Sequence, residues 1–150
     1  MIATAATSVC AAAAGVTSAV SASEACVEGK RKSGGVEVLT WCGPATATVK
    51  SAGKVYSFRG GRGRTSFGIF FVSIGTNTLD GPPRHKYFSL GIPAKRDGTF
   101  DAFLDIKWHL PGRYFSLLNE KVTLTNNLTR GRFSGVLDGK PATGTFSCNG

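Results

Sequence analysis

The sequence predicts an all-β fold, an antiparallel meander forming a sandwich or flattened barrel, and three observations support this class. Short apolar runs recur along the chain, with Gly and Pro breaks between them. The composition is rich in turn-forming glycine, with 20 Gly, and in aromatic residues suited to strands, with 10 Phe. No window shows the 3.6-residue apolar period of a helix. The length of 150 residues fits one domain.

The first 25 residues differ from the rest, because they contain no Lys or Arg and a single acid, Glu24. The run 11–20 resembles the apolar part of a signal peptide, and the small residues Val20-Ser21-Ala22 predict cleavage after Ala22. A basic leading region is missing, and one hypothesis is that the true start lies upstream of Met1. The alternative is an unstructured Ala- and Ser-rich tail. The first 25 residues are too weakly apolar and too rich in Ser and Thr to predict a transmembrane segment.

These features divide the chain into an export segment at residues 1–25, a polar, glycine-rich linker at 26–35, and a β-domain at 36–150. The predicted location is outside the cell or in the cell envelope. Within the β-domain, turn residues separate a series of strand-like runs. The runs are residues 36–42, 45–50, 54–59, 67–74, 86–92, 99–110, 113–118, 120–125, 128–137 and 142–148.

Two of these runs have informative patterns. Residues 67–74 are almost continuously apolar, which predicts a central strand buried on both faces. Residues 99–110 alternate with period two, which predicts one strand with a core face and a solvent face. The predicted core face holds Ala102, Leu104, Ile106, Trp108 and Leu110, and the other face holds Asp101, Phe103, Asp105, Lys107 and His109.

The cysteines are Cys10, Cys26, Cys42 and Cys148. They form no CxxC pair and no His lies at zinc spacing, so we expect no metal site. We predict a bridge from Cys42 to Cys148, because each ends a strand-like run. Such a loop would stabilise the domain by ~4–5 kcal/mol in the chain-entropy model. The alternative pair is Cys26 with Cys42. Cys10 lacks the small preceding residue of a lipid-attachment site.

Charge is the strongest global signal, since 18 Lys and Arg against 9 Asp and Glu give a net charge of +9. Such an excess attracts a protein to anionic partners, among them acidic polysaccharide, wall polymers, lipid headgroups and nucleic acid, of which we expect nucleic acid least. The simpler interpretation is a basic surface that serves solubility alone.

Two motifs could provide anion contacts. Arg59-Gly60-Gly61-Arg62-Gly63-Arg64 would place three guanidinium groups on a loop, able to bind phosphate, sulfate or carboxylate; the alternative is a solvated hairpin loop. A basic-then-aromatic pattern recurs at Arg84–Phe88, Arg113–Phe115 and Arg130–Phe133, and the alternative is Arg outside with the rings in the core. The predicted contact residues are Arg59, Arg62, Arg64, Arg84, Lys86, Arg130 and Arg132.

An enzyme is the least expected class. Asp101, Asp105 and His109 would share the solvent face of one strand, where charged residues are ordinary. Nucleophile, metalloprotease and phosphate-loop motifs are missing, and we expect no cofactor. The sequence therefore predicts a non-enzymatic secreted or envelope binding module that favours anionic partners. The alternatives are a secreted inhibitor whose loop 76–86, stiffened by Pro82-Pro83, docks into a partner, or a carrier of a small apolar ligand.

Several short segments resemble small exported lipoproteins of actinobacteria. They are Trp41-Cys42-Gly43-Pro44-Ala45, Lys54-Val55-Tyr56-Ser57-Phe58, Tyr87-Phe88, Asp97-Gly98-Thr99, Leu128-Thr129-Arg130-Gly131-Arg132-Phe133-Ser134-Gly135 and Gly144-Thr145-Phe146-Ser147-Cys148. Over residues 36–150 the chain is similar to the mycobacterial lipoprotein antigen family. The resemblance implies a cell-envelope β-domain without known catalytic residues. The chain departs from that family at its N-terminus, where a lipid-attachment motif is missing.

Overall fold

A computed structural model describes residues 25–101 and 104–149, and all regular structure in that part is β. The expected signal segment, its cleavage site and Cys10 lie outside the described residues. The strands are β1 (Gly29–Ser33), β2 (Val36–Thr40), β3 (Thr46–Ser51), β4 (Lys54–Arg59), β5 (Gly61–Ser66), β6 (Ile69–Thr78), β7 (Tyr87–Ile92), β8 (Gly98–Asp101), β9 (Leu104–Leu110), β10 (Arg113–Ser116), β11 (Leu118–Thr125), β12 (Arg130–Leu137) and β13 (Lys140–Ser147). The described residues contain no helix long and apolar enough to cross a membrane.

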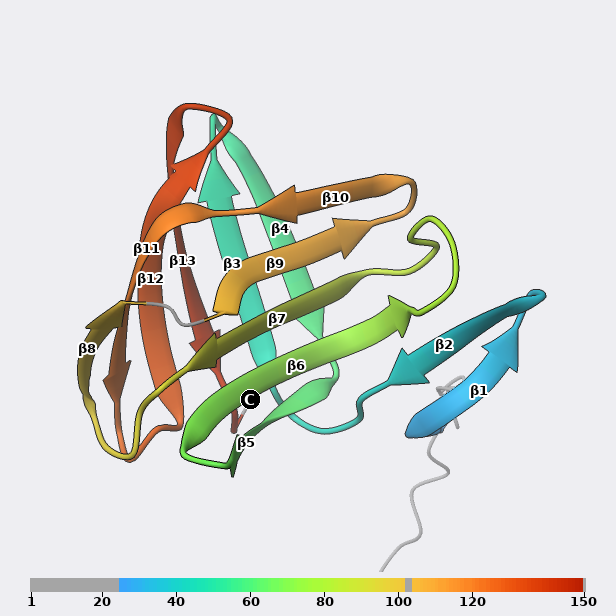
Figure 1. Cartoon of the computed structure of the whole chain (residues 1–150), viewed down its shortest axis with the longest axis horizontal. Helices are drawn as coiled ribbons and strands as arrows, with labels where there is room; N and C mark the ends of the chain where they lie inside the picture. The colour runs from blue at the N-terminus through green and yellow to red at the C-terminus, as the bar shows by residue number, and fades with distance from the viewer. Residues whose placement is uncertain (1–24, 102–103, 150) are drawn as a thin grey trace, which may run out of the picture.

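The strands form two antiparallel sheets that pack face to face (Figure 1). The seven-stranded sheet has the order β1-β2-β6-β7-β9-β10, with β5 also paired to β6. The six-stranded sheet has the order β4-β3-β13-β12-β11-β8, and its strands run across those of the first. The predicted all-β class is confirmed. Of the two predicted forms, the chain adopts the sandwich, because the sheets do not close into one barrel.

The core lies between the sheets and combines aliphatic side chains with a group of aromatic rings. Phe88 of one sheet lies 5.7 Å from Phe133 of the other, measured between ring centroids. Trp108 stacks on Phe115 at 5.0 Å, and both are buried. Phe88, Phe115 and Phe133 each belong to one of the three basic-then-aromatic segments. Their burial agrees with the alternative interpretation, in which strand alternation places the rings in the core, whereas Tyr114 of the second segment is exposed.

The chain passes from one sheet to the other at two glycines that lie against each other. Gly43 precedes β3 and Gly61 begins β5, and Ala45 N–H donates to the Gly61 carbonyl at 3.0 Å. A Cβ at Gly61 would collide with the Ser73 carbonyl, and one at Gly43 would collide with the Gly61 carbonyl. Glycine is required at both positions because only it permits this close approach of backbones.

The structure corrects several predicted boundaries. Residues 61–64 of the predicted Arg-Gly loop belong to β5, a strand paired with β6 along its whole length. Phe67 and Gly68, predicted to begin a buried strand, instead form the turn before β6. Part of the predicted linker forms β1, which pairs with β2. Residues 99–110 are not one strand, since β8 pairs with β11 and β9 pairs with β7 in the other sheet.

The predicted Cys42–Cys148 bridge is wrong, because Cys42 is bonded to Cys26, with their Cα atoms 5.9 Å apart. Pairing of Gly29 with Thr40 brings the two ends of the β1–β2 hairpin together, and a cysteine flanks each end. Cys148 is a free thiol that lies against Gly63 of β5. Burial raises the pKa of this thiol, which reduces its thiolate fraction at neutral pH.

Candidate anion-binding face

The candidate site is the outward side of the six-stranded sheet, which we call the hydroxyl face. Because Val49, Val122 and Phe133 are buried in the core, the residues next to them along each strand point outward. The outward positions are Thr46, Thr48 and Lys50 on β3; Val55, Ser57 and Arg59 on β4; Thr99 and Asp101 on β8; Lys121, Thr123 and Thr125 on β11; Arg130, Arg132 and Ser134 on β12; and Thr143, Thr145 and Ser147 on β13.

Strand register aligns these side chains into rows that cross the sheet. One row runs Ser57, Thr48, Thr145, Arg132, Thr123 and Thr99, each residue opposite the next. The neighbouring row runs Arg59, Thr46, Ser147, Arg130 and Thr125. Arg130 and Arg132 are therefore adjacent on the same side of β12, and hydroxyl groups flank each of them on both sides.

The rows line two hollows that open to solvent. The larger, about 560 Å³, includes Lys50, Lys121 and Arg132 in its lining, and the smaller, about 480 Å³, includes Arg130 and Arg132. Both hollows share Thr48, Thr123, Arg132 and Thr145, so they lie next to each other on the face. Arg132 lies where the two hollows meet.

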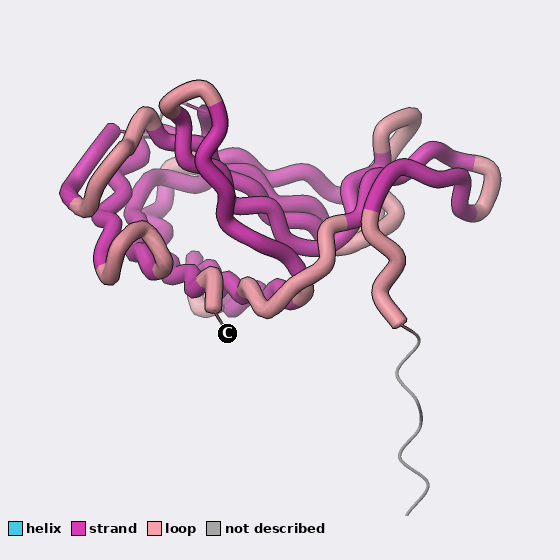
Figure 2. Tube along the Cα trace, turned by 90° about the horizontal axis from the view of Figure 1, so that it is seen from below, coloured by secondary structure: helices cyan, strands magenta, loops and turns pink. Residues whose placement is uncertain are grey.

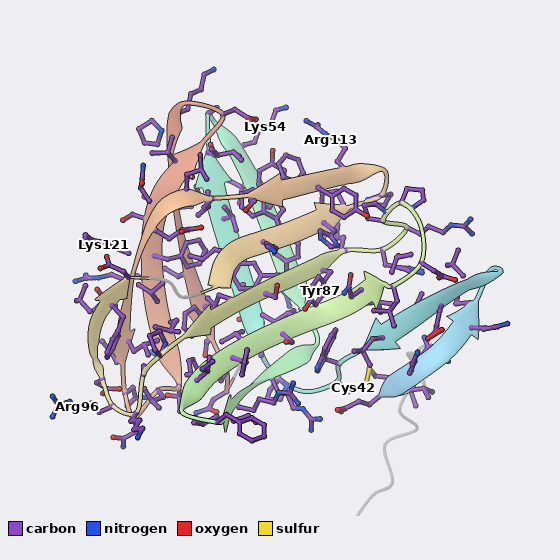
Figure 3. The ribbon with its side chains drawn as sticks, in the orientation of Figure 1. Cys42, Lys54, Tyr87, Arg96, Arg113 and Lys121 are labelled. Atoms are coloured by element: carbon purple, nitrogen blue, oxygen red, sulfur yellow. A yellow bond between two sulfur atoms is a disulfide. The ribbon has the colours of Figure 1, made fainter. Side chains whose placement is uncertain are left out.

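The hydroxyl face is strongly positive. Its cations are Lys50, Arg59, Lys121, Arg130 and Arg132, and its one acid among the outward positions above is Asp101. Lys121 and Asp101 pair at 2.9 Å, but both side chains are well exposed, so the pair contributes little to stability. Within the described part of the chain, no ion pair or hydrogen bond engages the guanidinium of Arg130 or Arg132. Lys121 projects away from the ribbon at this edge (Figure 3).

The structure separates the seven predicted contact residues. Arg130 and Arg132 are adjacent on the hydroxyl face, whereas Arg59 lies on the same face three strands away and lines a separate hollow with Lys86. Arg62 and Arg64 lie on β5 of the other sheet, where Arg62 pairs with Glu28 and Arg64 lies 5.8 Å from the centroid of the Phe71 ring. Arg84 donates to the Gly34 carbonyl at 2.7 Å, and Lys86 is exposed just before β7. The predicted Arg-Gly loop is therefore not a single anion site.

A second feature is a row of rings on the outer side of the seven-stranded sheet. Ring centroids lie 5.2 Å apart between Trp41 and Tyr87, 5.4 Å between Tyr87 and His109, and 4.6 Å between His109 and Tyr114. Burial raises the pKa of Tyr87. Burial, with a smaller effect of the Lys107 charge, lowers the pKa of His109. Tyr87 is labelled in Figure 3, where it lies over the middle of this sheet.

The shared solvent face predicted for Asp101 and His109 does not form. Asp101 belongs to β8 and His109 to β9, so the two residues lie in different sheets. In residues 25–101 and 104–149, no group of three His, Cys, Asp or Glu side chains could hold a metal ion.

The predicted docking loop at 76–86 is tied to the body of the protein. Leu79 N–H donates to the Glu37 carbonyl at 2.8 Å, and Gly112 N–H donates to the Pro83 carbonyl at 2.7 Å. The Tyr114 hydroxyl donates to the Gly81 carbonyl at 3.2 Å. These bonds fix the loop along both its flanks.

The sequence held a signal for the hydroxyl face that our interpretation did not use. Thr occupies alternate positions at Thr46 and Thr48, at Thr123 and Thr125, and at Thr143 and Thr145. Alternate positions of a strand share a side, so each pair predicts an outward, hydroxyl-bearing stripe. In comparisons with known proteins, no family model, no curated protein and no solved structure matches this chain.

Proposed function

We propose that the chain is a non-enzymatic secreted or cell-envelope binding module that holds an anionic polymer on the hydroxyl face. The observation that carries the proposal is the position of Arg130 and Arg132, two uncommitted guanidinium groups that line adjoining open hollows rich in hydroxyls. Export is supported by the Cys26–Cys42 disulfide, since such bonds persist mainly in oxidising compartments.

The chemistry of the face suits an oxyanion-bearing chain. A guanidinium group binds carboxylate, sulfate or phosphate through two parallel hydrogen bonds. Thr and Ser hydroxyls both donate and accept, so they suit the neutral oxygens between the charged groups. The row across six strands spans roughly 24 Å, from five strand spacings of about 4.8 Å. That length accommodates several monomers of a polymer.

The test compares two double variants with the same change in net charge. Calorimetry would measure binding of the full chain to polygalacturonate, a carboxylated polysaccharide, and to neutral dextran. We expect R130Q/R132Q to weaken binding to polygalacturonate at least about tenfold, because each charge-assisted hydrogen bond contributes about 1.5–3 kcal/mol. The matched control is R62Q/R64Q on the opposite sheet, and we expect it to retain most of the affinity. Dextran should not bind.

Equal losses in the two double variants would show that net charge alone attracts the polymer, and the assigned face would then be wrong. Binding of dextran as tight as that of polygalacturonate would remove the role of the guanidinium groups. The same pair of variants, titrated with duplex DNA, tests nucleic acid as the rival polyanion.

A further inference from the structure

The turn between β5 and β6 presents an unprotected aromatic ring. Phe67 and Gly68 connect Ser66 to Ile69 as a two-residue hairpin turn, with φ of 51° and 75°. Turns with two positive φ values favour Asn-Gly, and a bulky side chain in this region is strained. Phe67 has a relative exposure of 102%, against 64% for the next most exposed large hydrophobic residue of the described part. The ring is therefore held at a tip without packing against the protein.

Basic side chains lie near this tip. The Lys95 Cε atom lies 3.6 Å from the point that a Cβ on Gly68 would occupy, so Lys95 lies against the turn. Arg96 follows it in the exposed β7–β8 loop, and Arg64 is exposed on β5, three residues before Phe67. The two loops lie at the same end of the molecule, where Arg96 points away from the ribbon (Figures 1 and 3).

The nearby acid is engaged elsewhere. Asp97 accepts hydrogen bonds from the backbone N–H groups of Asn127 and Leu128 at 3.0 and 2.8 Å. Its charge is thus directed at the turn between β11 and β12, and the Phe67 end of the molecule presents one exposed apolar ring together with the cations Arg64, Lys95 and Arg96. This combination has charge complementarity to an anionic surface with an apolar interior.

We propose that Phe67 is an interfacial anchor for membranes containing anionic lipids. The ring inserts at the boundary between headgroups and acyl chains, and Arg64, Lys95 and Arg96 lie over the headgroups. A single apolar group binds a bilayer only marginally, and a basic patch supplies the second attraction that stable association requires. A protein pocket is a poorer fit, because interface anchors are normally ringed by further apolar contacts, whereas this ring is bordered by charge. Strain at an exposed position without a packing role also favours a functional interpretation.

The central experiment measures binding of the full chain to vesicles by sedimentation. The vesicles contain either phosphatidylcholine alone or an equal mixture with phosphatidylglycerol. We expect binding to the mixed vesicles only, and Phe67→Asn should reduce the partition coefficient at least about tenfold, as loss of a buried Phe side chain predicts. Phe67→Asn should fold normally and be at least as stable as the parent, since Asn tolerates positive φ. The matched control is Leu118→Ser, which removes another exposed apolar side chain and should leave partition unchanged.

A second readout reports insertion directly. Phe67→Trp places an indole at the tip, and brominated acyl chains should quench its emission, whereas Leu118→Trp should not be quenched. Mixed-vesicle binding that is unchanged in a folded Phe67→Asn variant overturns the proposal, as does failure of the parent chain to bind those vesicles. R130Q/R132Q should retain vesicle binding, so loss of the polymer site and loss of the anchor give different results.

Discussion

The carboxylate of Asp97 accepts a hydrogen bond from the backbone N–H of Leu128, and this bond joins the loop after β7 to the turn between β11 and β12. The turn is unusual because Asn126, Asn127 and Leu128 all have positive φ, at 58°, 56° and 63°. Such a backbone costs roughly 1 kcal/mol or more at each residue without glycine. Asp97 stabilises it by satisfying two consecutive N–H groups.

We expect Asp97→Ala to lower the free energy of unfolding by about 1–2 kcal/mol, because it removes two charge-assisted hydrogen bonds at an exposed position. Urea unfolding followed by tryptophan fluorescence would measure the change. Asp101→Ala is the matched control, since it removes an exposed acid that forms only a surface ion pair, and it should shift stability by less than about 0.5 kcal/mol. Equal effects of the two substitutions would contradict this role of Asp97.

Gly63 should be sensitive to the smallest substitution. An added Cβ would collide with Cys148 Sγ and would lie 3.1 Å from the ring of Phe70. We expect Gly63→Ala to destabilise the fold by about 1–3 kcal/mol, as overpacking does, and Cys148→Ala to recover part of the loss. Thr65→Ala on the same strand should be nearly neutral. A double-mutant cycle of Gly63→Ala and Cys148→Ala, followed by thermal or urea unfolding, measures the coupling between the two residues. If their losses of stability simply add, this contact does not limit the packing.

The Cys26–Cys42 bridge should stabilise the β1–β2 hairpin more than the rest of the fold. The bridge closes a loop with a sequence separation of 16, and such a loop contributes about 3 kcal/mol in the chain-entropy model. In the double variant with Cys26→Ser and Cys42→Ser, we expect amides of β1 to exchange up to roughly a hundredfold faster, with β12 little changed. Cys148→Ser provides the thiol control. If amide exchange became equally faster in both sheets, the bridge would instead stabilise the whole fold.

His109 should make stability depend on pH in the weakly acidic range. Because burial lowers its pKa below the ordinary value of 6.5, the unfolded chain binds the proton more readily than the folded chain. The contribution of His109 to the free energy of unfolding is therefore fully present above about pH 6.5. It is lost as the pH falls through the pKa that His109 has in the folded chain. Unfolding curves between pH 8 and 5 should show this decline in the parent chain and a smaller one in His109→Gln. His85 is retained in both proteins, so identical slopes would show that His109 is not responsible.

The alternation of apolar and polar residues predicted much of the fold, because it matches the buried and exposed positions of the strands. The predicted runs at 54–59 and 86–92 lie almost entirely within β4 and β7, and Ile106 and Trp108 occupy the predicted core face. The failures come from tertiary contacts. The Arg-Gly segment has low strand propensity, yet it forms β5 because Gly61 and Gly63 permit close approach of the core to its inner face.

The candidate site was predictable only in part. Alternation places Arg130 and Arg132 on one side of their strand, but it does not say which strands lie beside them. Arg59 reaches the same face because β4 pairs with β3 and β3 pairs with β13, a connection between distant segments. Likewise, the bridge to Cys26 depends on β1, whose polar residues show no apolar alternation.

The β1–β2 hairpin extends beyond the region where the two sheets face each other (Figures 1 and 2). Its ladder with β6 consists of three residue pairs, at Val38, Leu39 and Thr40, and hydrogen bonds from Leu79 to the Glu37 carbonyl and from Arg84 to the Gly34 carbonyl also hold it. The hairpin is therefore a flap that can detach, once these few contacts break, while both packed layers remain intact. The Cys26–Cys42 bond closes the flap into a ring, so a detached flap keeps its ends together and returns to the same register. Detachment would also expose the edge of β6, at Thr76–Thr78, where the strand of another molecule could pair.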